Sequence, residues 1–340
     1  MKSYLPVDRE ESFVDTRVPR PVPGDRDLLV AVKAISVNPV DTQIRSGQYK
    51  LFGEDIDQSP HILGWDVSGE VVGVGPGVHD YKVGDQVFYS GDITRPGADS
   101  EFHLVDERLA GRKPASLSYG EAAALPLTGI TAWESLFDRL KISPDGKDAG
   151  KSILIIGGGG GVGSMAIQLA AKVAKLRVIG TASSEESRAW VTKLGASVVV
   201  DHRNPLDKEL AAKGIETVDY ILVLGYMEQH WPAMVKVIAP QGSIASIKEA
   251  KGDPVDISAL KPKSVTFAWE TVFTRPSYQT TDMVEQQRLL NSISKMVDKG
   301  ELISTANEVM KPINAANLQK AHAKIEQGHT VGKIVLEGWE

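Results

Sequence analysis

The sequence predicts an α/β protein in which a doubly wound parallel-sheet domain is inserted between two parts of a β-rich domain. Three observations support this fold. Residues 1 to about 125 hold short apolar runs between glycine and proline turns, residues beyond about 150 alternate buried strands with helical patterns, and the end of the chain returns to mixed elements. A length of 340 residues suits two separate cores. The predicted domains are 1–124 and 269–340 for the β-rich domain and 125–268 for the sheet domain.

The individual elements follow from local patterns. In the β-rich domain, strand-like runs over 28–37 and 67–74 are separated from later elements by turn signals at 75–77 and 84–85. The sheet domain has five short buried runs, which we interpret as parallel strands: 153–156, 178–182, 198–201, 220–224 and 244–247. The last segment has two helical patterns and a final strand: 284–297, 315–325 and 333–336.

Composition excludes several classes of function. The net charge is −6 and the basic residues are scattered, so nucleic acid is a poor partner. No run of about 18 apolar residues occurs, and the N-terminus lacks the apolar stretch of a secretion signal. We therefore expect a cytoplasmic protein that does not bind membranes. The absence of cysteine rules out disulfides, thiolate nucleophiles and cysteine-ligated zinc.

A run of glycines carries the main functional signal. The segment IIGGGGGVG, residues 155–163, contains G-x-G-x-x-G at Gly158, Gly160 and Gly163. An apolar strand precedes it, and apolar residues recur at helical spacing after it. A flexible linker would instead be expected among serine and proline. Strand, loop and helix in this order predict that a dinucleotide pyrophosphate binds the N–H groups at the start of the helix.

The end of the second strand of the sheet domain indicates which dinucleotide binds. NAD enzymes carry an acid there, but residues 181–183 read Thr-Ala-Ser. Three side chains could supply donors to a 2′-phosphate if their loops converge: Arg188, His202 and Arg203. These features favour NADPH over NADH. Glu185 and Glu186 could repel the phosphate, but we prefer the interpretation that they begin the next helix.

Further motifs stand in a fixed order along the chain: 34–47, 62–72, 81–87, 124–132 and the glycine loop. Together they resemble the medium-chain dehydrogenases/reductases, and specifically their quinone oxidoreductase branch. The run 261–278 and the final 332–336 look like a subgroup often labelled zinc-type alcohol dehydrogenase-like. The resemblance implies a Rossmann domain inserted in a GroES-like catalytic domain, and a homodimer or homotetramer.

Zinc ligands are missing at the positions where this family would place them. The positions that match the catalytic zinc ligands of zinc-dependent relatives are Asn38, Trp65 and approximately Ala124, and none of them is a plausible ligand. The cysteine-rich lobe that holds a second zinc would follow Val87, and it is also missing. The histidines lack a two-histidine spacing with an acidic third ligand. We expect no metal.

The expected cofactor contacts combine the glycine loop with positions implied by the resemblance. They are Asn38, Thr128, Gly158, Gly159, Gly160, Gly161, Val162, Gly180, Ser183, Arg188, His202, Gly225, Ser246, Ile247 and Phe273. In the family, the place of His202 contacts the adenosine end of the cofactor; the alternative is an exposed loop histidine. Phe273, with Phe267 and Trp269, could line a pocket for a flat acceptor or pack between domains.

Two residues are the catalytic candidates, Tyr49 and Asn38. Tyr49 can hydrogen-bond the substrate oxygen or relay a proton without a metal, although it could equally cap a strand edge. By resemblance Asn38 and Thr128 border the nicotinamide. Since Pro39 follows Asn38, a turn residue is the alternative for Asn38. Asp66 could be a catalytic group or a buried, paired carboxylate.

These features together predict a reaction class. Without a Lewis acid, reduction of an activated acceptor is easier than oxidation of a simple alcohol. We predict a zinc-independent, NADPH-dependent oxidoreductase that reduces quinones or other conjugated carbonyl acceptors by hydride transfer. An NADPH-dependent enoyl or alkenal reductase would share the same machinery. A non-catalytic NADPH-binding or sensor protein is the alternative from another class.

Overall fold

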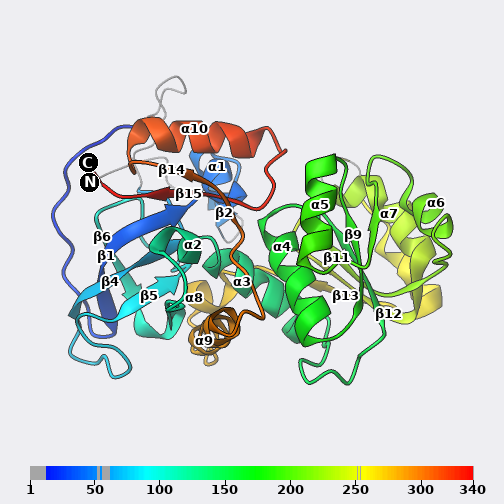
Figure 1. Ribbon diagram of the computed structural model, residues 1–340, viewed down its shortest axis with the longest axis horizontal. Coiled ribbons are helices and arrows are strands. Elements are labelled where there is room, and N and C mark those ends of the chain that lie inside the picture. Colours follow the sequence, from blue (N-terminus) through cyan, green and yellow to red (C-terminus); the bar gives the residue numbers. More distant parts are fainter. Residues whose placement is uncertain (1–12, 52–53, 56–61, 251, 253, 340) are drawn as a thin grey trace. The chain divides into compact units, whose positions relative to one another are not determined.

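The chain folds into two compact units, and the sequence of the second interrupts the sequence of the first (Figure 1). The computed structural model describes residues 13–51, 54–55, 62–250, 252 and 254–339. Unit 1 comprises Met1–Leu127 and Phe273–Glu340, and unit 2 comprises Thr128–Val272. The predicted fold class is confirmed: a parallel-sheet unit interrupts a β-rich unit. The predicted boundaries, after 124 and after 268, lie a few residues before those of the units.

Unit 1 is built on a seven-stranded sheet in the order β14-β15-β1-β4-β5-β7, with β6 also paired to β1. Its strands are β1 (Asp27–Ser36), β4 (Val67–Val74), β5 (Gln86–Tyr89), β6 (Phe102–Asp106), β7 (Ala110–Arg112), β14 (Ala306–Met310) and β15 (Lys333–Glu337). A separate pair consists of β2 (Lys50–Leu51) and β3 (Glu54–Asp55). The apolar residues of β1 are almost all buried, as expected for a strand that pairs with β15, β4 and β6 inside the sheet.

The helices of unit 1 are short except near the C-terminus. They are α1 (Pro39–Arg45), α2 (Tyr119–Ala123), α8 (Thr274–Tyr278), α9 (Glu285–Asp298) and α10 (Ala315–Glu326), with a 3₁₀ turn at Glu107–Leu109. Helix α3 (Pro126–Trp133) carries the chain from unit 1 into unit 2. The two long helices lie close to their predicted ranges, 284–297 and 315–325.

Unit 2 contains a six-stranded parallel sheet in the order β10-β9-β8-β11-β12-β13. The strands are β8 (Ser152–Ile156), β9 (Arg177–Thr181), β10 (Val198–Val200), β11 (Val218–Val223), β12 (Ile238–Ser246) and β13 (Thr266–Trp269). The order reverses at β8, where chain connections run to opposite sides. Such a switch point opens a crevice at the carboxyl ends of the strands, where ligands of doubly wound sheets bind.

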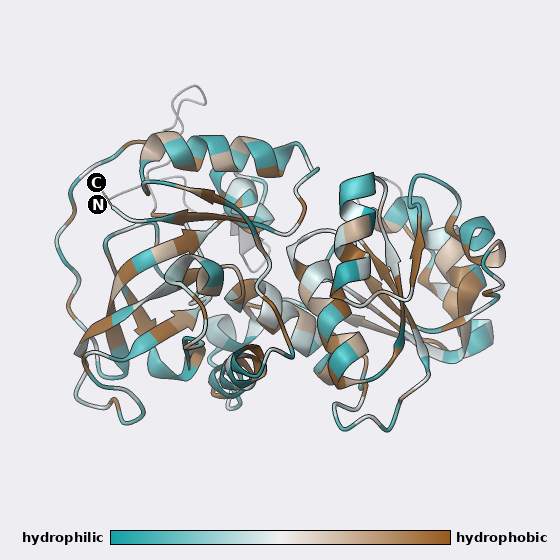
Figure 2. Ribbon diagram, in the orientation of Figure 1, coloured by the Kyte–Doolittle hydropathy of each residue, from teal (hydrophilic) through white to brown (hydrophobic). Residues whose placement is uncertain are grey.

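Helices cover both faces of this sheet (Figure 1). On one face lie α4 (Gly161–Gln168), its π-helical continuation Leu169–Val173, and α5 (Glu185–Leu194); on the other lie α6 (Leu206–Ala211) and α7 (Met227–Val237). Shorter segments are a π-helical turn at Glu134–Arg139 and a 3₁₀ helix at Ile257–Lys263. Figure 2 shows the strands as hydrophobic and the outer helix surfaces as largely hydrophilic, which places the core between sheet and helices. Among the described residues, no helix combines the length and apolarity needed to cross a membrane.

Candidate functional site

The glycine loop joins β8 to α4 in unit 2. Gly157 has a φ of +90°, a conformation that favours glycine, and its N–H donates to the hydroxyl of Thr181 at 2.9 Å. Gly160 is the residue before the helix, and its carbonyl oxygen accepts the N–H of Ser164 at 2.8 Å. The first N–H groups of α4 therefore point out of the helix without an intrahelical acceptor. This arrangement can bind an anion such as a pyrophosphate.

The room for an added Cβ atom distinguishes glycines that pack against the protein from glycines that face outward. A Cβ on Gly163 would lie 2.4 Å from the carbonyl oxygen of Gly157, so this glycine allows the loop to approach the helix. A Cβ on Gly160 would have as its nearest neighbour the same oxygen at 3.8 Å. The surface at Gly160 is thus open, and a side chain there would occupy the space that a ligand on the helix N-terminus needs. The residues present fit a dinucleotide.

Basic side chains converge beside the end of β9, as the NADPH prediction requires. Arg188 donates to Asp201 at 2.9 Å, and Arg203 donates to the same carboxylate at 2.6 Å. Arg203 also donates to the carbonyl oxygen of Ser183 at 3.0 Å. Sequence analysis missed Asp201, which follows β10 in the chain. Hydrogen bonds and charge from Arg203, together with Arg188, hold the pKa of Asp201 well below its usual range. The backbone N–H of Asp201 in turn donates to the carboxylate of Glu209 at 3.1 Å, so two arginines and two carboxylates meet here. The arginines are the groups that can donate to a 2′-phosphate.

Neighbouring residues complete this end of the sheet. His202 contacts the hydroxyl of Thr181 at 3.2 Å, and its ring lies nearly parallel to that of Tyr226, with centroids 6.4 Å apart. Burial lowers the pKa of His202, so the neutral ring is favoured at neutral pH. Glu185 and Glu186 begin α5, with Ser184 as its N-cap, which confirms the preferred interpretation of both acids. Sequence analysis did not single out Tyr226, an exposed residue in the left-handed region with φ of 54°.

We expect Arg188→Ala to weaken NADPH binding by about tenfold or more and to leave NADH binding nearly unchanged, since a charge-assisted hydrogen bond contributes about 1.5–3 kcal/mol. Dissociation constants for both cofactors at fixed, moderate salt measure the effect. Arg177, exposed at the opposite end of β9, offers a matched control as Arg177→Ala. Equal weakening of NADPH and NADH binding would contradict a 2′-phosphate contact.

Ala182→Asp is a less clean test of cofactor preference, because Ala182 is only 1% exposed and a carboxylate there would be buried.

The other predicted cofactor residues of unit 2 lie in three different places. Ser246 and Ile247 lie at the carboxyl end of β12, and Gly225 follows β11 with open space around it. All three thus lie at the carboxyl edge of the sheet, the edge where doubly wound sheets generally bind ligands. Thr128 is buried within α3. Gly180 instead lies inside β9, where a Cβ would contact Ala196 at 3.4 Å. Ile167 of α4 and Val191 of α5 are also near, at 3.5 and 3.7 Å, so the missing side chain at Gly180 lets the strand pack against these helices. The cofactor contact expected at Gly180 stays a prediction.

A pair of buried glutamates lies at the same edge of unit 2. Glu270 follows β13, and its N–H donates to the carbonyl oxygen of Ser246 at 2.9 Å. Arg139 donates to Glu270 at 2.7 Å and lies 4.0 Å from Glu134. Burial, and then the charge of Glu134, raise the pKa of Glu270 well above its ordinary value of 4.5. The pair of glutamates therefore shares a proton at neutral pH.

This raised pKa predicts a pH-dependent stability. Because the folded state binds the proton more tightly than the unfolded state, the stabilisation is complete at acid pH and is lost as the pH rises above 4.5 toward the folded-state value. Glu270→Gln supplies a neutral donor that does not titrate. We expect its melting temperature to fall less than that of the wild type between about pH 6 and about pH 9. Parallel curves for the two proteins would contradict the assignment.

In unit 1, the three positions that match zinc ligands have other roles. Asn38 is buried at the start of α1, and its side-chain amide donates to Asp66 at 3.0 Å. The indole N–H of Trp65 donates to the carbonyl oxygen of Asp92 at 3.2 Å. Ala124 packs in an apolar cluster with Ala34, Ala123 and Val335. Among the described residues, no group of three or more histidine, cysteine, aspartate or glutamate side chains could hold a metal ion.

The remaining candidates of unit 1 differ in accessibility. Tyr49 is half-buried, and burial raises the pKa of its phenol, so the hydroxyl stays protonated at neutral pH. Asn38 is 1% exposed and its amide is engaged inside the protein, which favours the interpretation that it supports the site rather than touches substrate. Phe273 is buried, and its ring is edge-on to that of Trp65, with the ring centroids 6.3 Å apart. Asp66 is the buried, paired carboxylate of the two alternatives.

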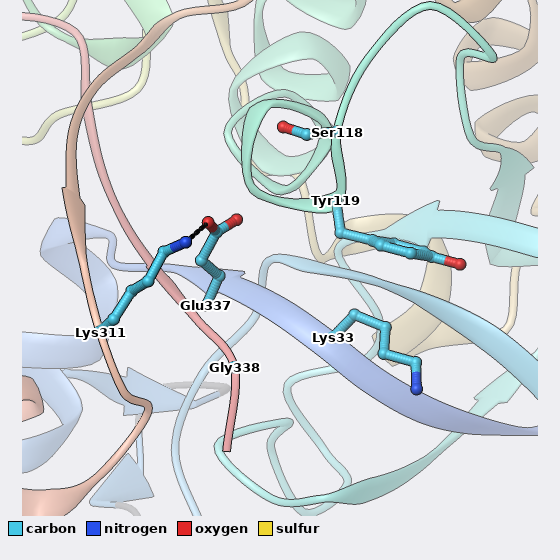
Figure 3. A pocket seen from close by; sticks show the side chains of 6 residues that line it. All are labelled: Lys33, Ser118, Tyr119, Lys311, Glu337 and Gly338. Atoms are coloured by element: carbon cyan, nitrogen blue, oxygen red, sulfur yellow. Dashed lines mark ion pairs between the residues drawn. The ribbon is translucent and has the colours of Figure 1, made fainter. Parts of the chain in front are cut away.

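A pocket elsewhere on unit 1 contains none of the predicted site residues. It has a volume of about 340 Å³ and is lined by Lys33, Ser118, Tyr119, Lys311, Glu337 and Gly338 (Figure 3). Lys311 and Glu337 form an ion pair across it at 2.6 Å. Both side chains are partly exposed, so the pair adds little to stability.

Two dehydrogenase family models match separate parts of the chain. Residues 24–124 match the model described as the alcohol dehydrogenase GroES-like domain, and residues 194–336 match the one described as zinc-binding dehydrogenase. A zinc-type alcohol dehydrogenase-like protein of Staphylococcus aureus is 40% identical over 318 residues, which cover 93% of this chain and 92% of that protein.

Solved structures show the same fold over almost the whole chain. A protein from Rhizobium etli assigned as a zinc-dependent alcohol dehydrogenase superposes with a TM-score of 0.88 at 46% identity, over 95% of this chain and 92% of that one. The Escherichia coli quinone oxidoreductase complexed with NADPH superposes with a TM-score of 0.78 at 25% identity, over 95% of each chain.

Proposed function

The chain belongs to the medium-chain dehydrogenase/reductase superfamily, and from this premise we propose that it is a zinc-independent, NADPH-dependent reductase of quinones or other conjugated carbonyl acceptors. One observation carries the proposal beyond the family. The side chains at the three zinc-ligand positions, Asn38, Trp65 and Ala124, are an amide, an indole and a methyl group. Such side chains do not bind zinc. Without cysteine anywhere in the chain, the thiolate ligands typical of such sites are also missing.

The cofactor would be held by unit 2. The outward N–H groups at the start of α4 would bind the pyrophosphate, and the open surface at Gly160 would let it approach. Arg188 and Arg203 would face the 2′-phosphate, with His202 and Tyr226 beside them. The NADPH complex of the Escherichia coli quinone oxidoreductase supports the same choice by similarity. We propose NADPH as the preferred dinucleotide.

Side chains of unit 1 would handle the charge that develops on the acceptor. Bound NADPH would supply a hydride to the electron-poor carbon of the acceptor. Negative charge then gathers on the conjugated oxygen, and a preorganised donor stabilises it. Tyr49 can donate that hydrogen bond because a phenol keeps its proton at neutral pH, and burial raises its pKa further. The reaction consumes one proton besides the hydride, and a phenol that exchanges with solvent can relay it.

An NADPH-oxidation screen over quinones, alkenals and enoyl thioesters tests this function, with a strong chelator in a parallel series. We expect turnover with at least one quinone or conjugated carbonyl, unchanged by the chelator, in protein that contains no stoichiometric zinc. Preference for an alkenal or enoyl thioester would identify the alternative reductase. One zinc per chain with activity lost on its removal would refute zinc independence. NADPH binding without any turnover would indicate a sensor or binding protein.

A further inference from the structure

A buried carboxylate in unit 1, Asp66, gathers four hydrogen bonds from three separate segments of the chain. It has no exposed surface. Its Oδ2 atom accepts from the hydroxyl of Ser36, the side-chain amide of Asn38 and the ammonium of Lys333, each at 3.0 Å. Its Oδ1 atom accepts from the backbone N–H of Leu127 at 2.9 Å. Only an ionised carboxylate offers this many acceptor positions.

Lys333 supplies the positive charge that such a carboxylate needs. It begins β15 and is 3% exposed. Besides Asp66, its ammonium donates to the carbonyl oxygen of Val37 at 2.9 Å and to the side-chain oxygen of Asn38. All three N–H groups of the ammonium therefore have partners. A buried charge is tolerated when it is paired and fully hydrogen-bonded in this way, and removal of one partner is costly.

The pair fixes both polar ends of the Asn38 side chain. The amide nitrogen donates to Asp66, and the amide oxygen accepts from Lys333, so the side chain can take only one orientation. The N–H of Asn38 is held by Asp41 at 2.7 Å, which anchors the start of α1. Through Leu127, Asp66 also fixes the peptide that precedes Thr128 in the chain. Asn38 and Thr128 are the residues that the family resemblance assigns to the nicotinamide.

We propose that Asp66 and Lys333 are a positioning pair for the proposed hydride transfer: the ionised carboxylate orients Asn38 and the Leu127 peptide, and the ammonium compensates its charge. The proposal rests on the proposed function and adds two residues that touch neither substrate nor cofactor. Misplacement of a reacting partner by about 1 Å can lower a rate by about a hundredfold. A loss of the pair should therefore appear in kcat rather than in the affinity for NADPH, whose phosphates are held by unit 2.

The test compares Lys333→Met and Lys333→Arg with wild type, using kcat, KM for NADPH and acceptor, and thermal unfolding. We expect Lys333→Met to lower kcat by about 10- to 100-fold with each KM within about threefold of wild type. Lys333→Arg keeps the charge and should recover most of the loss. Arg95→Met is the matched control, because it breaks another ion pair of unit 1, with Asp27 at 2.8 Å, and should lower stability without the loss in kcat.

Ser36→Ala decides the question if Lys333→Met does not fold. It removes one donor from Asp66 without removing a charge, and we expect a kcat lower by about two- to fivefold at unchanged KM. A folded Lys333→Met with wild-type kcat, or failing that variant a wild-type kcat in Ser36→Ala, would overturn the positioning pair and leave the proposed function intact. Absence of turnover in the wild type with every acceptor would overturn the proposed function, and the pair with it.

Discussion

Replacement of Gly160 by valine is expected to weaken NADPH binding by about a hundredfold or more in a chain that still folds. The branched side chain would stand over the N–H groups at the start of α4, where the pyrophosphate approaches. Loss of one or two charge-assisted hydrogen bonds, each about 1.5–3 kcal/mol, accounts for a loss of this size. The fold should tolerate the change, since φ is −76° and the nearest atom to an added Cβ is 3.8 Å away. Titration of NADPH together with thermal unfolding measures both effects.

Gly163→Ala, in the first turn of α4, is the matched control for a glycine that packs against the loop. Its Cβ would lie 2.4 Å from the oxygen of Gly157 and 2.7 Å from the Cα of Gly158, so the loop or the helix must move. We therefore expect Gly163→Ala to lower the melting temperature, whereas Gly160→Val mainly lowers affinity. Unchanged NADPH affinity in a folded Gly160→Val would show that the glycine loop is not the cofactor site. If both variants merely unfold the protein, the loop has only a packing role.

Local sequence patterns predicted five of the six strands of unit 2 and missed β13 (Thr266–Trp269), an edge strand without a fully buried residue. The run Ile153–Ile156 is apolar throughout because a parallel strand is buried on both faces, and the glycines that follow it mark the turn into a helix. Helix α5 was predicted to begin at Glu185 because first-turn acids favour the helix dipole. Apolar runs, glycine turns and first-turn acids each involve residues close together in the sequence. Their spacing is therefore enough to predict these strands and helices.

The electrostatic partners of the site could not be predicted in the same way. Asp201 lies beside Arg188 only because β10 pairs with β9, and Lys333 reaches Asp66 across 267 positions of sequence. Glu134 and Glu270 likewise come together only in the folded unit. The one local signal was a lysine directly before the apolar run Ile334–Leu336 of the final strand, where a charge is unexpected unless it is paired. At Gly180 the sequence pattern is ambiguous, because a strand glycine can serve packing as well as ligand approach.

Tyr49→Phe is expected to lower kcat by about 100- to 1000-fold while the KM for the acceptor changes little. If the phenol donates to the oxygen that gains charge in the transition state, its loss resembles removal of an oxyanion donor, about 2.7–4 kcal/mol. An interaction made mainly in the transition state appears in kcat, whereas one made equally with bound substrate appears in KM. Steady-state kinetics of NADPH oxidation with the best acceptor from the screen separates the two.

Tyr81→Phe is the control for loss of a phenol hydroxyl at a place remote from chemistry. The hydroxyl of Tyr81 donates to the backbone oxygen of Ala110 inside unit 1, and burial raises its pKa to about 12. Its removal should cost about 1 kcal/mol of stability and leave kcat unchanged.

The raised pKa of Tyr49 also predicts that wild-type kcat does not fall through phenol ionisation below about pH 10, since the donor stays protonated. A loss in Tyr49→Phe confined to KM would make Tyr49 a binding residue, and a wild-type kcat would remove it from the reaction and leave the half-buried ring as a cap for the strand edge.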